Sequence, residues 1–325
     1  MYIIRTASII IIVLYLCFTV SNKTNMKSKK IVIDTDPGGD DALAVMLALF
    51  MHKAREIEIL AITVTYGNTL LENAEKNILK ILTIADEKVP VYAGAVKPLI
   101  NSYTDECYFG NDGFGDFNFT QEITAKIDRS KHASVALVDL VKRYPGEITV
   151  ITLGPLTNIA TAIALEPNFL NFTEQHIMMG ANIAKNSFEF NFMLDPESDW
   201  IVLNNTNKPS VILPLDTVYS HAISKEEYRN LFNNWNNSIA NFLHQAEEKS
   251  LEKQDSWQPA DGFTMAIALQ PDIIMQSYET NLIPELVGNA RGSAIINSDN
   301  EIHNAKIIQK FDKVAFQSLL SKYFS

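Results

Sequence analysis

The sequence predicts an α/β fold, a mostly parallel open sheet flanked by helices, with a late hairpin and a C-terminal helix. After residue 30, apolar runs of strand length alternate with longer segments of helical periodicity. Such alternation produces a parallel sheet covered by helices on both faces. The chain has 325 residues, of which 47% are hydrophobic, enough for a sizeable core. No repeat or clear linker divides it, so we predict a single domain over residues 30–325.

The first predicted unit is a buried strand at 31–33, a tight turn at Pro37-Gly38-Gly39 and a helix from Ala42 onward. Apolar runs predict further strands at 57–66, 89–93, 148–153 and 209–215. Helical patterns follow at 72–85, 133–143 and 156–165, then a polar helical stretch at 225–252, a hairpin at 282–296 and a closing helix at 313–324.

The stretch from 96 to 120 is long, glycine-rich and aromatic. Loops of this length without secondary structure are usually functional, so we expect it to cover a site.

The N-terminus has the pattern of a signal peptide over residues 1–21. Arg5 precedes an apolar stretch at 9–20, and the small residues Thr19 and Ser21 suit cleavage before Asn22. An uncleaved anchor is the alternative, but a membrane span usually needs about 20 apolar residues. We therefore expect a secreted protein without stable membrane association after cleavage. Acceptor sequons agree with that route and lie at Asn22, Asn118, Asn171, Asn204 and Asn236.

Cysteine content and net charge indicate which stabilising bonds and which partners to expect. Cleavage would remove Cys17 and leave Cys107, so no internal disulfide is expected. The formal net charge of -11 and the pI of about 5.1 argue against a nucleic-acid partner, because phosphate binding needs clustered Lys and Arg. A small neutral substrate fits this composition better.

Four carboxylates cluster at the connection between the first predicted strand and the first predicted helix: Asp34, Asp36, Asp40 and Asp41. In an open α/β sheet, ligands bind in the crevice beyond the carboxyl ends of the strands. These charges would repel one another without a positive partner, and oxygen ligands of this kind suit Ca²⁺ or Mg²⁺.

Other interpretations of this cluster are open. Single aspartates in it could be structural, because Asp caps turns and helix starts. An EF-hand loop would need alternating oxygen ligands and a Glu at its twelfth position, and neither is present. Phosphatases that form an aspartyl-phosphate also place D-x-D after a strand, but their continuation does not resemble Pro-Gly-Gly-Asp-Asp.

Five motifs in order make the chain resemble the inosine-uridine-preferring nucleoside hydrolase family. The resemblance runs from about Lys30 to the C-terminus, and D-T-D-P-G-x-D-D-A at 34–42 is its most specific part. The other motifs are Tyr-Gly-Asn at 66–68, Leu-Gly-Pro-Leu-Thr-Asn at 153–158, Glu-Phe-Asn at 189–191 followed by Asp-Pro-Glu at 195–197, and Ala-Asp at 260–261.

The resemblance implies a set of site residues. One Ca²⁺ would be held by Asp36, Asp41, Asp261 and the backbone carbonyl of Leu153, and Asp36 would also be the general base toward the attacking water. Carboxylates around the ribose would stabilise an oxocarbenium-like transition state. The ribose hydroxyls would be held by Asp40, Asn68, Asn186, Glu189 and Asn191. Asn158 could equally be a turn or cap residue.

The chain departs from the family pattern at the leaving group. Nonspecific members have a His before the last metal Asp and another in the first long loop, and those places hold Ala260 and Phe109 here. Purine-preferring relatives stack the base between aromatic side chains, and Tyr108, Phe109 and Trp257 are near the corresponding places. Stacking favours the larger purine surface. His221 is a possible substitute acid, although a lone His is more often structural.

These inferences predict a secreted, Ca²⁺-dependent nucleoside N-ribohydrolase that releases ribose and a free base, with purine nucleosides preferred. Its partner is a small-molecule nucleoside, and a homo-oligomer is possible. One alternative is a catalytically idle nucleoside- or ribose-binding protein, favoured by Ala260 and Phe109 but not by the intact Asp36. A weaker one is a metal-dependent phosphohydrolase, which would need cations near the Asp cluster, and no convincing Lys or Arg motif is there.

Overall fold

The computed structural model describes residues 28–183, 187–205, 207–235 and 237–325. The predicted signal segment 1–21, the predicted ribose ligand Asn186, and the sequons at Asn22 and Asn236 lie outside the described residues. Within the described part of the chain, no helix is long and apolar enough to cross a membrane.

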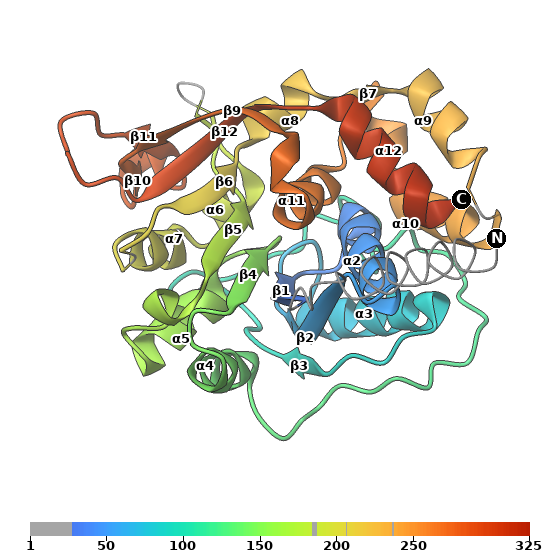
Figure 1. Cartoon of the computed structure of the whole chain (residues 1–325), viewed down its shortest axis with the longest axis horizontal. Coiled ribbons are helices and arrows are strands. Elements are labelled where there is room, and N and C mark those ends of the chain that lie inside the picture. Colours follow the sequence, from blue (N-terminus) through green and yellow to red (C-terminus); the bar gives the residue numbers. More distant parts are fainter. Residues whose placement is uncertain (1–27, 184–186, 206, 236) are drawn as a thin grey trace, which may run out of the picture.

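An eight-stranded sheet forms the centre of the molecule (Figure 1). Neighbouring strands are parallel except for the last pair, β12 and β9, which are antiparallel. The mostly parallel open sheet predicted from the sequence is therefore confirmed. In spatial order the strands are β3 (Val91–Ala93), β2 (Ile57–Val64), β1 (Lys29–Thr35), β4 (Ile148–Thr152), β5 (Gln175–Met179), β6 (Ser210–Leu213), β12 (Ala305–Phe311) and β9 (Ile274–Thr280).

Helices cover both faces of this sheet because successive side chains of a buried strand point to opposite sides. Ile31 and Ile33 of β1 belong to a core with α2, α3, α10, α11 and α12, whereas Val32 belongs to a core with α4, α5 and α7. The helices are α2 (Gly39–Lys53), α3 (Leu71–Ala85), α4 (Ala133–Arg143), α5 (Thr157–Leu165), α6 (Phe190–Leu194), α7 (Pro196–Leu203), α8 (Leu215–Ser220), α9 (Lys225–Phe232), α10 (Asn237–Lys253), α11 (Ala260–Leu269) and α12 (Lys313–Phe324).

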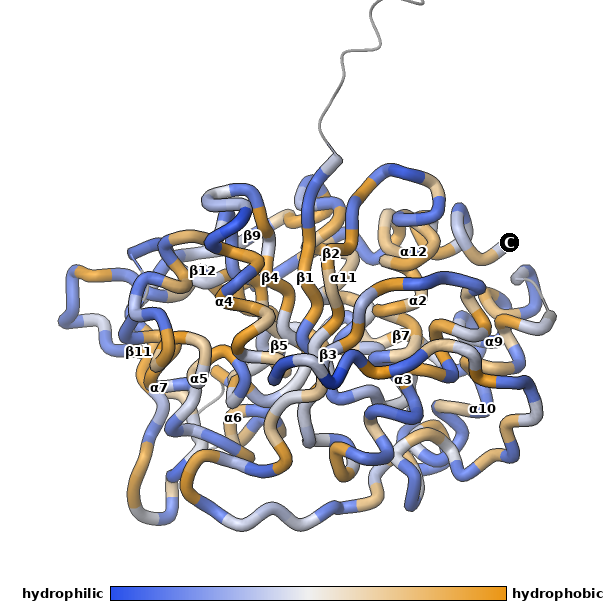
Figure 2. Tube along the Cα trace, turned by 90° about the horizontal axis from the view of Figure 1, so that it is seen from below, coloured by the Kyte–Doolittle hydropathy of each residue, from blue (hydrophilic) through white to orange (hydrophobic). Residues whose placement is uncertain are grey.

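Helix α2 is deeply buried. It lies between the sheet and the helices α10, α11 and α12, and its residues 41–49 are all buried. Figure 2 shows the same pattern, with apolar stretches running along β1, β4 and α2 inside the molecule. Because its first turn carries Asp40 and Asp41, this burial fixes the position of both carboxylates.

Short elements complete the chain. The predicted hairpin is present as the antiparallel pair β10 (Leu282–Pro284) and β11 (Ala294–Ile296), and a second small pair joins β7 (Ile223–Ser224) to β8 (Ser256–Trp257). The stretch 225–252, predicted to be helical, forms the two helices α9 and α10. Strands β5, β9 and β12 were not predicted. Single 3₁₀ turns occur at Leu170–Phe172, Pro271–Ile273 and Gly288–Ala290.

The order of the strands creates a crevice beside β1. The chain builds outward from β1 through β2 to β3, then returns to place β4 on the other side of β1. Such a switch point is where ligands bind in open α/β sheets. Asp36 follows β1 and Leu153 follows β4, so both lie at this edge.

Candidate active site

Asp36 is clamped between the turns that follow β2 and β4. Its carboxylate is 1% exposed, and its Oδ2 accepts a hydrogen bond of 2.7 Å from the backbone N–H of Asn68. A Cβ atom at Gly67 would lie 2.0 Å from Oδ2, and one at Gly154 would lie 2.3 Å from Oδ1. Only glycine allows both turns to approach the carboxylate so closely. Oδ1 has no hydrogen-bond partner among the described residues.

Asp41 is held more fully, at the first turn of α2. It accepts hydrogen bonds from the hydroxyl of Thr35, from the backbone N–H of Gly38 at 2.9 Å, and from the side-chain amide of Asn68 at 3.0 Å. Asn68 therefore joins the turn after β2 to the start of α2. These bonds fix the direction in which the carboxylate points.

Asp261 reaches the same place from a distant part of the sequence. It lies in the first turn of α11, which packs against α2, and its backbone N–H lies 3.5 Å from Oδ2 of Asp40. Carboxylate oxygens of Asp40, Asp41 and Asp261 all lie within 4.8 Å of one another. The predicted ligand Asp36 is not in this closest group, and Asp40, predicted to bind ribose, is.

Burial and mutual repulsion dominate the electrostatics of this group. Burial, and after it the charge of Asp41, raise the pKa of Asp40 to about 7. Burial and Asp41 likewise raise the pKa of Asp36, and burial and Asp40 raise that of Asp261. A divalent cation would favour the ionised forms of all these groups.

The opposite wall contains the predicted ribose residues Glu189 and Asn191. Glu189 caps α6 and accepts backbone N–H bonds from Asn191 at 2.9 Å and Phe192 at 3.0 Å. The side-chain amide of Asn191 donates to the carbonyl of Leu153 at 2.7 Å. A carbonyl has two lone pairs, so Leu153 keeps one for another partner. Burial raises the pKa of Glu189 to about 7.

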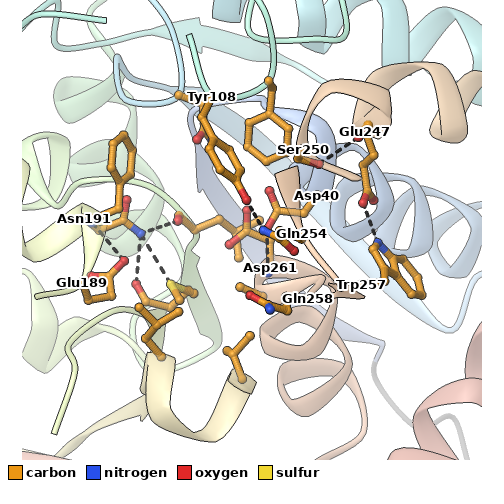
Figure 3. A pocket seen from close by; sticks show the side chains of 18 of the residues that line it. Asp40, Tyr108, Glu189, Asn191, Glu247, Ser250, Gln254, Trp257, Gln258 and Asp261 are labelled. Carbon is orange, nitrogen blue, oxygen red and sulfur yellow. Dashed lines mark hydrogen bonds between the residues drawn. The ribbon is translucent and has the colours of Figure 1, made fainter. Parts of the chain in front are cut away.

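These walls enclose a cavity of about 280 Å³ (Figure 3). Asp36 and Asp41 are not on its lining, whereas the other predicted site residues that the structure describes are. Buried carboxylates, a free lone pair on a backbone carbonyl and the unpartnered Oδ1 of Asp36 form a donor set of hard oxygens, which fits a divalent cation. The predicted residues on the lining are Asp40, Asn68, Tyr108, Phe109, Leu153, Glu189, Asn191, Trp257 and Asp261.

The end of the cavity away from Glu189 and Asn191 is lined by aromatic side chains. Tyr108 and Phe109, from the predicted functional loop, have ring centroids 4.8 Å apart and perpendicular planes. Lys253 of α10 fixes this loop by donating to the carbonyl of Tyr108 at 2.8 Å. Trp257 is only 1% exposed and packs edge-on against Tyr228. It therefore offers the cavity only a small part of its ring.

Helix α10 and the residues after it contribute side chains that the sequence did not predict. Glu247 is 2% exposed, and its Oε2 accepts a hydrogen bond of 2.5 Å from Nε1 of Trp257. No local signal marks this group, because one Glu in a polar helix is usually a solvated residue. The unpredicted lining residues of this region are Glu247, Ser250, Gln254 and Gln258.

Three other residues that the sequence analysis singled out, His221, Asp34 and Asn158, make contacts that stabilise the fold. The ring of His221 stacks on Phe311 at 4.2 Å, its Nδ1 lies 2.8 Å from the carbonyl of Thr217, and it does not line the cavity. Asp34 is buried and accepts a bond of 2.8 Å from the amide of Asn158. The Asn158 Oδ1 in turn accepts from the backbone of Ala95 at 2.8 Å, so Asn158 joins β1 to the segment after β3.

Crowded carboxylates and amides at the switch point of an open α/β sheet, next to a row of aromatic side chains, define a site of the nucleoside hydrolase class. The profile of the inosine-uridine preferring nucleoside hydrolase family matches residues 31–318, and the chain belongs to this family.

The named relatives of this chain differ in the nucleoside bases that their names specify. The chain is 37% identical to an inosine-uridine preferring nucleoside hydrolase of Leishmania major over 55% of its length and 58% of that protein. It is 33% identical to a pyrimidine-specific ribonucleoside hydrolase of Escherichia coli over 59% of its length and 61% of that protein. These alignments thus span somewhat over half of the curated relatives. The structure superposes on an inosine-guanosine nucleoside hydrolase with a TM-score of 0.81 and 26% identity, covering 91% of this chain and 99% of the other.

Proposed function

We propose that the protein hydrolyses the N-glycosidic bond of ribonucleosides, giving ribose and a free base, with Ca²⁺ as its cofactor. The observation that carries this proposal is the group of Asp40, Asp41 and Asp261, whose oxygens lie within 4.8 Å of one another at a cavity with Glu189 and Asn191 on its other wall. A polyol held between these walls would meet carboxylate and amide groups on both sides. Family membership supports this reaction.

Asp36, Asp41, Asp261 and the carbonyl of Leu153 are the residues that would hold the cation. A bound Ca²⁺ would increase the acidity of the attacking water and hold ribose hydroxyls. The carboxylate of Asp36 would accept a proton from that water, because its Oδ1 is buried and has no other partner in the described structure.

Asp40, Asn68, Glu189 and Asn191 would position the ribose. The backbone N–H groups around Glu189 hold its carboxylate in one orientation, and the bond from Asn191 to Leu153 fixes the amide. Asn186 was predicted to take part as well. Preorganised negative groups around the sugar would stabilise the positive charge that develops at C1′.

Purine nucleosides are the proposed preferred substrates. The rings of Tyr108 and Phe109 at the far end of the cavity support this, because stacking contributes about 1 to 3 kcal/mol per base and grows with the stacked surface.

The deciding experiment is an assay of reducing sugar with inosine, adenosine, guanosine, uridine and cytidine, each with and without a chelator. We expect ribose release that the chelator abolishes and added Ca²⁺ restores. An idle binding protein would bind nucleosides without releasing ribose, and that result would refute the proposal. Hydrolysis that persists after removal of all divalent cations would refute the role of Ca²⁺.

We also propose that residues 1–21 direct secretion. Protein collected from the medium of a eukaryotic host should begin near Asn22, as N-terminal sequencing would show. A chain that retains Met1 and stays in the cytosol would refute this.

A further inference from the structure

The described lining of the cavity offers no histidine that could protonate a departing base. The family positions for such a group hold Ala260 and Phe109, and none of the described residues that line the cavity is a histidine. Purine and pyrimidine anions are poor leaving groups, so protonation of the base in the transition state lowers the barrier. A general acid is therefore expected among the side chains at the aromatic end of the cavity.

Glu247 has the required position and surroundings. Figure 3 shows it on the wall beyond Asp40, on the side away from Glu189 and Asn191. Its Oε2 is occupied by the indole N–H of Trp257, which leaves Oε1 as the oxygen without a hydrogen-bond partner among the described residues. A buried carboxyl with one anchored oxygen and one free oxygen has a fixed direction.

The surroundings favour the protonated form of this carboxyl. Burial raises the pKa of Glu247 well above its usual value, and the carboxylate of Asp40 on α2 raises it further. Two phenols also face Glu247, namely Tyr108 of the loop and Tyr228 of α9. A negative charge on Glu247 would raise the pKa of both. The indole N–H of Trp257 acts in the opposite direction.

The other acids of the lining suit this role less. Glu189, Asp40 and Asp261 lie at the ribose end and are engaged there. Glu106 is exposed to solvent, and burial raises the pKa of Tyr108 to about 12, which makes the phenol a weak acid at neutral pH. Among the acids of the described lining, Glu247 is therefore the one that is buried and lies away from the ribose end.

We propose that Glu247 is the catalytic acid that protonates the leaving base, an assignment that rests on the proposed hydrolysis. The Oε1 proton passes to a ring nitrogen of the base as the bond between C1′ and the base nitrogen breaks. The electron pair of that bond stays on the base, and the oxygen of water bonds to C1′ while its proton goes to Asp36. The proton on Asp36 is then released to solvent, and Glu247 takes one up, so one water is consumed in each turnover.

The test compares Glu247→Gln with the wild type on three substrates. Gln keeps an oxygen that can accept from Trp257 but has no acidic proton. Guanosine needs an acid, whereas 7-methylguanosine, with a cationic base, and 4-nitrophenyl β-D-ribofuranoside, with a stable phenolate, leave without one. We expect kcat on guanosine to fall by about 10² to 10⁴-fold, with the other two substrates within a few-fold of wild type. Glu248→Gln, an exposed neighbour on the same helix, is the matched control.

Each outcome decides a definite point. Equal losses on all three substrates, or no loss on guanosine, would overturn the role of Glu247 while leaving nucleoside hydrolysis intact. A wild type that cleaves none of the three would instead refute the proposed function. If Glu247→Gln does not fold, the wild type still decides: similar kcat on guanosine and 7-methylguanosine supports an acid, and an excess of 100-fold or more for 7-methylguanosine overturns it.

Discussion

At the scale of single residues, Asp36 shows how close packing fixes a carboxylate. Two glycines allow the turns after β2 and β4 to enclose its carboxylate, and one oxygen is fixed by the backbone of Asn68. The other oxygen stays without a partner in the described structure, which is costly unless a ligand uses it.

Asp36→Asn should separate binding from chemistry. The substitution keeps the size of the side chain and much of its bonding, but removes the proton acceptor. We expect kcat to fall by about 10² to 10⁴-fold with a smaller change in KM. Steady-state kinetics on inosine measures both quantities. Normal turnover by this variant would leave Asp36 as a ligand only.

Tyr108→Ala tests the stacking of the base. The ring of Tyr108 is more accessible than that of Trp257, so its removal should cost purine nucleosides about 10- to 100-fold in kcat/KM and change uridine far less. Trp257→Ala should affect both classes of base more evenly, because that ring is buried against Tyr228. An unchanged inosine-to-uridine ratio in Tyr108→Ala would contradict the proposed purine preference.

Asp199 is a buried carboxyl outside the cavity, and it should lower stability as the pH rises. Neither of its oxygens has a hydrogen-bond partner within the described residues, and burial, then the charges of Asp195 and Glu189, raise its pKa. The folded chain thus holds a proton that the unfolded chain releases above about pH 4. The free energy of unfolding therefore falls as the pH rises from there toward the folded pKa.

Asp199→Ala removes this effect. The stability of the variant relative to wild type should increase by more than about 1 kcal/mol between pH 5 and pH 8, as urea denaturation would show. The exposed substitution Glu301→Ala is the control and should show no such trend. A difference that is the same at both pH values would mean that Asp199 is ionised in the folded protein.

At the scale of elements, the loop after β3 depends on α10 for its position. Phe114, Phe117 and Phe119 of the loop surround Phe242 of α10, with ring centroids 5.6, 5.9 and 6.1 Å from it. The same loop carries Tyr108, and the same helix carries Glu247. Packing between the two elements therefore sets the width of the aromatic end of the cavity.

Phe242→Ala should loosen that end. Replacing a buried Phe by Ala typically costs about 3 to 5 kcal/mol, and Phe242 is 3% exposed. We expect urea denaturation to show this loss, and kinetics to show a higher KM with a smaller change in kcat. Val314→Ala, exposed on α12, should stay within about 0.5 kcal/mol of wild type. Unchanged stability would mean that the aromatic cluster contributes little.

At the scale of the whole molecule, folding confines several like charges to one small volume. Asp41 comes from the first turn of α2 and Asp261 from a helix 220 positions later, a separation taken from their residue numbers. Their repulsion opposes the folded state unless a cation is bound, so the folded protein should bind Ca²⁺ far better than the unfolded chain.

Added Ca²⁺ should therefore raise the melting temperature. At a concentration 100 times the Kd, binding to the folded state alone contributes about 2.7 kcal/mol, which corresponds to several degrees. Thermal denaturation with a chelator, and with increasing Ca²⁺, measures this. Asp41→Asn and Asp261→Ala should lose both the shift and hydrolysis. A shift of wild-type size in either variant would place the cation elsewhere.

The sequence alone determined the strands, helices and motifs that local patterns encode. The strand before Asp34, the turn through Gly38 and the helices at 133–143 and 313–324 follow from periodicity and turn residues within about a dozen positions. The family resemblance predicted that Asp36, Asp41 and Asp261 would meet, whereas the closest group in the structure consists of Asp40, Asp41 and Asp261. Strand β12 was missed because its neighbours come from distant parts of the chain.

Only the tertiary structure decided which side chains share the cavity and what state burial gives them. The packing of α10 and α11 against α2 places Glu247 and Asp261 near Asp40, and no local pattern specifies that contact. Burial of Trp257 and of the Oε1 of Glu247 is likewise a property of the packed core. Local sequence sets backbone preferences, but desolvation and the convergence of charges arise only when distant elements exclude water together.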